Sequence, residues 1–155
     1  MNETTRVLVA EDDPSDQLLL ETAFKNAGLD RKVRYVNDGA QAVEYLKDAR
    51  NADLPAILLV DLKMPRMNGF ELMDWVGRQR RLDAMRVVVL TSSDAPDDRT
   101  HAVGLGADEY YLKPRDIHEL FRLAVKLNLY VETHEALARP VNGKSAAGSV
   151  SNSPN

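Results

Sequence analysis

Five side chains suited to polar chemistry each stand directly after a short apolar run of this sequence. Glu11 and Asp12 follow VLVA, Asp61 follows AILLV, Thr91 follows RVVVL, and Lys113 follows YYL. An apolar run that ends in a charged residue is typical of a buried strand reaching the surface, where the charge needs a partner or a chemical role. Carboxylates, a hydroxyl and an ammonium together indicate positioning and charge neutralisation around a phosphoryl group.

The first acidic stretch reads Glu11-Asp12-Asp13-Pro14. A nucleotide-binding sheet would have glycines at this point, so the carboxylates favour a cation instead. Pro14 suits the first position of a helix, which makes Asp13 the predicted N-cap and places Asp16 at N3, where its charge favours the helix N-terminus. Glu11 and Asp12 remain. They are either solvated loop acids or, together with Asp61, ligands of Mg²⁺, which prefers oxygen donors.

These residues must be positioned by alternating strands and helices. Strands are predicted at 6–10, 33–36, 56–61, 86–90 and 109–112, where β-branched and aromatic residues gather. Segments with helical spacing separate them; the first stops at Gly28 and the last opens near Asp116. The alternation predicts an α/β fold, a flavodoxin-like doubly wound parallel sheet of order 2-1-3-4-5 with helices on both faces. A site in such a sheet lies at the carboxyl ends of the strands.

Composition limits the classes of function. The chain has 155 residues, of which 44% are hydrophobic and 28% charged, with a net charge of −4 and no cysteine. We therefore expect one cytoplasmic domain that binds neither nucleic acid nor membrane and has no disulfide or thiolate metal site. No stretch has the pattern of a signal peptide or a membrane span.

The C-terminal part holds two predictions. The last helix continues through KLNLYVETHEAL (126–137), adding Leu129, Tyr130, Val131 and Leu137, which either dock a partner or pack on the core. The domain is thus predicted to cover 1–137. Residues 138–155, rich in Ser, Gly, Asn and Pro, are expected to form a disordered tail, and we expect no output domain of helix-turn-helix size within this chain.

The ordered set of motifs VLVAEDDPSD, LLVDLKMPRMNGFEL, VVVLTSS and GADEYYLKP resembles the receiver domain of two-component response regulators. The resemblance covers residues 6 to about 130. It implies that Asp61 is the phosphoacceptor and takes a phosphoryl group from a sensor histidine kinase. It also implies a Mg²⁺ site made by Glu11, Asp12, Asp61 and the backbone carbonyl of Lys63.

The resemblance further implies a switch. Thr91 corresponds to the switch hydroxyl, Lys113 to the lysine that pairs with the phosphate, and Tyr110 to an aromatic rotamer switch. The Lys113–Pro114 peptide bond is expected to be cis. Phosphorylation would then change the surface of the fourth helix, fifth strand and fifth helix.

The expected function is a single-domain phosphoacceptor regulator, not an enzyme. The C-terminal end and the spacing of NDGAQAVEYL are similar to small regulators paired with bacterial phytochrome kinases. Partners would be the kinase and a downstream target or phosphotransfer protein, or a second copy in a homodimer. Two alternatives remain. A binding-only pseudo-receiver would be expected to lack an acid, the Asp or the Lys, and an Asp-nucleophile phosphohydrolase commonly needs an acid where Lys63 stands.

Overall fold

The five predicted apolar runs form one parallel sheet. In the computed structural model, which describes residues 4–138, the strands are β1 Val7–Ala10, β2 Val33–Val36, β3 Ile57–Val60, β4 Arg86–Thr91 and β5 Glu109–Leu112. Their order across the sheet is β2-β1-β3-β4-β5, and every neighbouring pair is parallel. The predicted flavodoxin-like topology is therefore confirmed.

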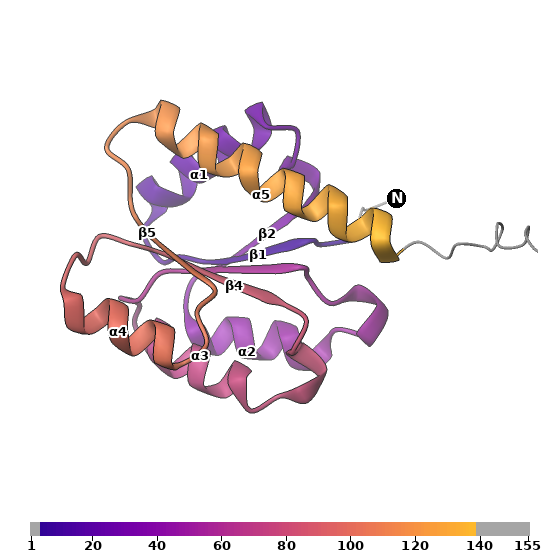
Figure 1. Ribbon diagram of the computed structural model, residues 1–155, viewed down its shortest axis with the longest axis vertical. Coiled ribbons are helices and arrows are strands. Elements are labelled where there is room, and N and C mark those ends of the chain that lie inside the picture. The colour runs from indigo at the N-terminus through magenta and orange to yellow at the C-terminus, as the bar shows by residue number, and fades with distance from the viewer. Residues whose placement is uncertain (1–3, 139–155) are drawn as a thin grey trace, which may run out of the picture.

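Helices cover both faces of the sheet, as predicted. They are α1 Pro14–Asn26, α2 Gly39–Asp48, α3 Gly69–Gly77, α4 Pro96–Gly104 and α5 Ile117–Ala138, with one-turn 3₁₀ helices at Asp30–Lys32, Asn51–Asp53 and Arg80–Leu82. Figure 1 shows α1 and α5 on one face and α2, α3 and α4 on the other. Two hydrophobic clusters fill the spaces between the sheet and these two layers.

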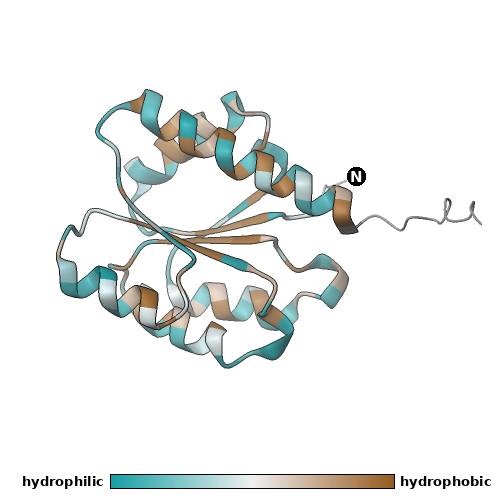
Figure 2. Cartoon of the chain, in the orientation of Figure 1, coloured by the Kyte–Doolittle hydropathy of each residue, from teal (hydrophilic) through white to brown (hydrophobic). Residues whose placement is uncertain are grey.

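Side chains of each central strand alternate between the two clusters. Along β1, Val7 and Val9 pack under α1 and α5, whereas Leu8 and Ala10 pack under α2 and α3. All residues of β1 and β3 are buried. This burial on both faces explains why these strands read as unbroken apolar runs (Figure 2).

Helix α1 begins and ends where the sequence predicts. The Asp13 carboxylate accepts hydrogen bonds from the backbone N–H groups of Ser15 and Asp16 and so caps the helix, with Pro14 in its first turn. At the other end Gly28 adopts φ +80°, a left-handed conformation that glycine reaches without strain. The cap places the first turn of α1 directly beside the end of β1.

Helix α5 continues to Ala138, which confirms its predicted extension. Val131 is fully buried in the cluster beneath α1 and α5, so the extension packs on the domain's own core. Glu135 also pairs with Lys32 at 3.1 Å and lies 3.6 Å from Arg6. Leu129 and Leu137 stay exposed. One side of the extension therefore packs on the core, and the other side exposes apolar side chains to solvent.

The predicted tail lies outside the described residues, apart from Ala138, which ends α5. Within residues 4–138, none of the helices has both the length and the hydropathy to cross a membrane.

Candidate functional site

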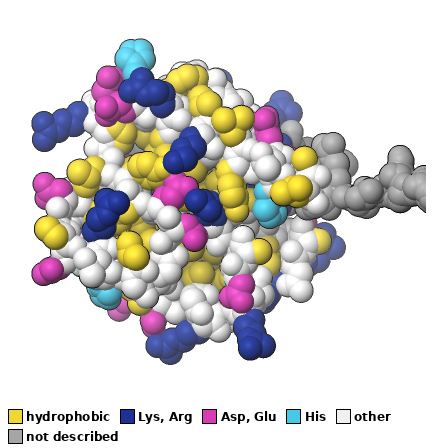
Figure 3. All heavy atoms as spheres, viewed as in Figure 1, with side chains coloured by type: hydrophobic (Ala, Val, Ile, Leu, Met, Phe, Trp, Pro, Cys, Tyr) yellow, Lys and Arg dark blue, Asp and Glu magenta, His cyan; other side chains and the backbone are white. Residues whose placement is uncertain are grey.

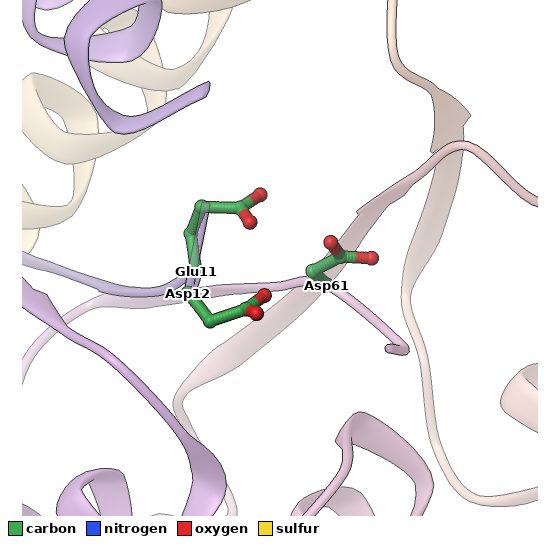
Figure 4. Close-up of side chains that lie close together, drawn as sticks. All are labelled: Glu11, Asp12 and Asp61. Atoms are coloured by element: carbon green, nitrogen blue, oxygen red, sulfur yellow. The ribbon is translucent and has the colours of Figure 1, made fainter. Parts of the chain in front are cut away.

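The acidic residues after β1 and β3 meet because their strands are neighbours. Ala10 pairs with Val60 in the sheet, and the Asp61 N–H continues the ladder with a 3.1 Å hydrogen bond to the Ala10 carbonyl. Carboxylate oxygens of Glu11, Asp12 and Asp61 lie within 4.8 Å of one another. Figure 4 shows the three side chains gathered at the ends of these two strands. Glu11 and Asp61 are buried, whereas Asp12 is exposed and opens the cluster to solvent.

Lys113 lies in the middle of the acidic residues. Its Nζ is 2.9 Å from Glu11, 2.8 Å from Asp61 and 2.6 Å from Asp16. The backbone N–H of Lys113 also donates to the Thr91 carbonyl at 2.8 Å, which continues the β4–β5 ladder past Leu112. Four of the five predicted strand-end residues thus share one cluster, and the fifth, Thr91, borders it through the backbone.

The prediction of a cis peptide bond between Lys113 and Pro114 is wrong. Among the described residues no peptide bond is cis. Trans is the usual form of a bond before proline, by about 0.5–1 kcal/mol. In this structure the Lys113 side chain is oriented by its three carboxylate partners and its backbone hydrogen bond, and these contacts are compatible with the trans form.

Burial dominates the pKa of Glu11, whereas for the pKa of Lys113 burial is outweighed by the hydrogen bonds to carboxylates taken together. Burial raises the pKa of Glu11 from 4.5 to about 7, because desolvation outweighs the hydrogen bonds from the Asp13 N–H and Lys113. For Lys113, burial would lower the pKa, but hydrogen bonds to Asp16, Asp61 and Glu11 reverse this and raise it above 10.5. The ammonium of Lys113 is stabilised in its charged form by three carboxylates at once. Each carboxylate, in contrast, shares this one ammonium with the other two.

Thr91 is fully buried at the end of β4 and leads into a short network. Its Oγ1 accepts a 3.3 Å hydrogen bond from the Ser93 N–H. The Ser93 carbonyl accepts one from the Tyr110 hydroxyl at 2.9 Å, and Ser93 Oγ lies 2.5 Å from a carboxylate oxygen of Asp98 in the first turn of α4. The two predicted switch residues, Thr91 and Tyr110, are therefore both hydrogen-bonded to the backbone of Ser93.

The loop between β3 and α3 is shaped around Asp61 by close backbone contacts. A Cβ at Gly69 would lie 2.4 Å from the Asp61 carbonyl oxygen, so only glycine fits there. Asn68 and Glu71 form a capping box that starts α3. The Lys63 N–H lies 3.4 Å from Asp61 Oδ1, whereas the metal role of the Lys63 carbonyl stays a prediction.

Beside this loop is a groove of about 600 Å³, lined by Asp12, Leu62, Lys63, Met64, Pro65, Asn68, Phe70 and Asp98. A larger cavity of about 790 Å³ lies around Arg6, Arg81 and His134, and its lining includes residues that precede β1, β3 and β4. It contains none of the predicted site residues, so we place the chemistry at the acidic cluster.

Comparison with known proteins decides the family. A model described as "Response regulator receiver domain" matches residues 7–125. The chain belongs to the response regulator receiver domain family. As a receiver domain it is a phosphoacceptor module of two-component signalling, and histidine kinases phosphorylate such domains.

Three relatives show how the receiver sequence and fold are shared. Response regulator Rcp1 of Synechocystis sp. is 28% identical over 120 residues, which are 76% of this chain and 82% of Rcp1. Its Mn²⁺-bound crystal structure matches with a TM-score of 0.71 at 27% identity, over 82% of this chain and 94% of that one.

The other two relatives are solved structures. The phosphorylated cyanobacterial phytochrome response regulator RcpA matches with a TM-score of 0.74 at 27% identity, over 85% of this chain and 96% of RcpA. The bacteriophytochrome response regulator RtBRR is 36% identical with a TM-score of 0.67, over 80% of this chain and 77% of RtBRR.

The acidic cluster of this receiver fits a divalent cation. Its donors are all carboxylate oxygens, two of them buried, and hard divalent cations prefer such donors. Rcp1, a relative, has a Mn²⁺-bound form.

Two ion pairs near the receiver site, Lys113 with Asp16 and Arg66 with Asp38, are not predicted by the sequence. Asp16 was assigned only a favourable charge at the helix N-terminus, yet it makes the shortest contact to Lys113. Its N3 position in the turn that follows β1 was the available signal, because that turn faces the same edge of the sheet. Arg66, at φ +63°, pairs at 2.5 Å with buried Asp38, and nothing in the sequence pattern linked these two residues.

Proposed function

We propose that Asp61 accepts a phosphoryl group from a phosphohistidine of a sensor histidine kinase. The observation that carries this assignment is the buried Asp61 carboxylate at the end of β3, 2.8 Å from Lys113 Nζ and within the acidic cluster. A carboxylate so placed has a cation beside the position where charge develops. Phosphoryl transfer depends mainly on such positioning and charge neutralisation.

In the proposed reaction an Asp61 carboxylate oxygen attacks the phosphorus of the phosphohistidine. The new P–O bond forms as the P–N bond breaks, and the electron pair of that bond returns to the imidazole nitrogen, which takes up a proton. Lys113 holds Asp61 in place beforehand and then offsets charge on the transferred oxygens. The product is an acyl phosphate on Asp61.

We assign the cation as Mg²⁺, held by Glu11, Asp12, Asp61 and the backbone carbonyl of Lys63. When bound, it would supply positive charge to the oxygens of the phosphoryl group. The exposed Asp12 leaves the cluster open on one side, which suits an ion that retains several waters.

The signal is proposed to pass through Thr91 and Tyr110. A phosphoryl group on Asp61 adds acceptor oxygens that the Thr91 hydroxyl can bond. Movement of Thr91 would break its 3.3 Å contact with the Ser93 N–H, and Ser93 is bonded to both Tyr110 and Asp98. The change would therefore reach β5 and α4 together and alter the face made by α4, β5 and α5.

We propose a bacterial phytochrome as the cognate kinase, because the similar proteins RcpA and RtBRR are phytochrome response regulators. The chain would act in the cytoplasm, away from nucleic acid and membrane, on a downstream target or phosphotransfer protein. A direct assay would mix the chain with a phosphorylated bacterial phytochrome and follow transfer of the label; transfer no faster than from an unrelated sensor kinase would contradict this pairing.

Asp61→Asn tests the phosphoacceptor. Wild type incubated with Mg²⁺ and acetyl phosphate should gain the mass of one phosphoryl group, and Asp61→Asn should gain none. Asp13→Asn is the matched control, because asparagine also caps a helix, the Asp13 carboxylate accepts only from N–H groups of α1, and the backbone N–H that donates to Glu11 is unchanged by the substitution. Equal labelling of wild type and Asp61→Asn would reject the assignment, and undiminished labelling in excess chelator would reject the metal.

The same assay separates the alternatives. A binding-only pseudo-receiver would take up no phosphoryl group, and the simultaneous presence of Glu11, Asp12, Asp61 and Lys113 in one cluster argues against it. A phosphohydrolase would release phosphate with continuous turnover. The exposed Lys63 stands where a second acid would be needed for that reaction.

A further inference from the structure

Lys113 divides its contacts among three carboxylates, and only two of them belong to the acidic cluster. Glu11 and Asp61, at 2.9 Å and 2.8 Å from Nζ, share that cluster with Asp12. Asp16, at 2.6 Å, projects from the first turn of α1. An ammonium and a metal ion would therefore draw on the same two buried carboxylates, whereas Asp16 is available to the ammonium.

A divalent cation in the cluster weakens the hold of Glu11 and Asp61 on Lys113. Their oxygens would be directed at the ion, and the ion and the ammonium repel each other strongly at short range. Asp16 is not subject to this competition. It stands in the first turn of α1, outside the cluster, with its carboxylate 2.6 Å from Lys113 Nζ.

We propose that Asp16 is a positioning residue that retains Lys113 beside Asp61 when a divalent cation occupies the acidic cluster. The inference rests on the metal site proposed above. With Asp16 present, four carboxylates hold two cations side by side. Without it, Lys113 depends on Glu11 and Asp61 alone and competes directly with the metal ion for them.

Mn²⁺ binding to the full chain, measured from the electron paramagnetic resonance signal of the free ion, tests this role without any phosphorylation assay. Asp16→Asn is expected to weaken Mn²⁺ binding by about tenfold, as loss of a residue that supports a metal site commonly does. Asp13→Asn removes one charge from the same turn and keeps the cap. It should weaken binding by no more than about twofold, the effect of an exposed charge.

Removing the ammonium distinguishes action through Lys113 from a simple charge effect. Lys113→Met should bind Mn²⁺ more tightly than wild type, because the competing cation is gone. In that background Asp16→Asn should cost no more than about twofold, since two residues that act as a unit are not additive. A tenfold loss that persists without Lys113, or no loss in wild type, would overturn the inference.

The metal proposal and the Asp16 inference fail differently. If wild type binds no Mn²⁺, both are rejected. If wild type binds Mn²⁺ and Asp61→Asn weakens that binding while Asp16→Asn does not, the metal site stands and only the role of Asp16 is rejected. Thermal melting of each variant confirms that it is folded under the conditions of the titration.

Discussion

Glu11 lies 2.9 Å from Lys113 and still has a pKa raised to about 7, because burial disfavours its charged form more than its hydrogen bonds favour it. Unfolding exposes the side chain and returns its pKa to 4.5. Between these two values the native state binds a proton that the unfolded state has released. The unfolding free energy therefore falls as the pH rises through this window.

Glu11→Gln should remove that dependence. Measured in chelator by chemical denaturation, the stability of the variant relative to wild type is expected to increase as the pH rises from 5 to 7. Lys113 stays charged throughout, because its pKa is raised above 10.5, and so adds no slope of its own. Glu44→Gln, on the exposed surface of α2, controls for the loss of a carboxylate. Parallel curves for wild type and Glu11→Gln would contradict the prediction.

At the scale of elements, α3 is packed so closely that its first residue touches the backbone of Asp61. A Cβ at Gly69 would lie 2.4 Å from the Asp61 carbonyl oxygen and 2.8 Å from Leu62 Cα. Because the contacting atoms are backbone atoms, they cannot move aside as a flexible side chain would. To make room for a side chain at position 69, the backbone at the start of α3 and at the end of β3 would have to move apart.

Gly69→Ala should therefore destabilise the domain by about 1–3 kcal/mol, the usual cost of overpacking, and slow labelling of Asp61. Gly104→Ala is the matched control, because a Cβ at that position meets nothing within 4 Å. It should instead stabilise by about 0.4–1 kcal/mol through the unfolded state. Denaturation curves and the acetyl phosphate assay measure both effects; a neutral Gly69→Ala would mean that the loop can relax.

Helix α4 is tied to the end of β4 through Ser93. Ser93→Ala removes the 2.5 Å contact to Asp98, and loss of a buried hydrogen bond costs about 1 kcal/mol. We expect faster amide hydrogen exchange in α4, since its N-cap, Ala95, offers no side-chain cap. Ser92→Ala, one residue earlier and exposed, should leave the exchange rates unchanged. Equal exchange in the two variants would show that other contacts hold α4.

At the scale of the whole molecule, we propose association through the face made by α4, β5 and α5. Figure 3 views this face and shows hydrophobic side chains around a centre of mixed basic and acidic groups. Val103, Leu112 and Leu129 contribute exposed apolar side chains, one from each element. Glu109 of β5 pairs with Arg86 of β4 and Lys126 of α5. For Val131 the sequence leaves partner docking and core packing open; the structure buries it fully, so it belongs to the core and not to this face.

Sedimentation with and without beryllium fluoride, a phosphoryl mimic, tests this face. If two copies pair, the sedimentation coefficient should rise in the mimic-bound state and Leu112→Glu should abolish the rise. Leu18→Glu, at a leucine on α1 that is 62% exposed against 50% for Leu112, is the control and should keep it. If instead the face receives a different protein, wild type stays monomeric and Leu112→Glu weakens kinase or target binding. A monomer in both states with unchanged binding would reject the face.

Much of the fold could be predicted because it depends on local rules. Apolar runs mark buried strands, Asp13 and Gly28 mark the ends of α1, and the alternation of strands and helices indicates a doubly wound parallel sheet, whose expected order the structure confirms. The meeting of Glu11, Asp12 and Asp61 also follows, since carboxyl ends of neighbouring parallel strands share one edge of the sheet. These features need only sequence spacing and the handedness of the connections.

Side-chain partners across that edge were decided by the tertiary structure. Spacing along the chain places Asp16 on a helix turn, but only the tertiary packing, in which α1 lies against α5 on one face of the sheet, brings it within 2.6 Å of Lys113. The pairing of Arg66 with Asp38 and the burial of Val131 likewise depend on distances between separate elements. The sequence by itself determined which groups gather at the carboxyl edge. Which carboxylate holds which cation depends on differences of an ångström or two in three dimensions, and these exist only once the helices have packed against the sheet.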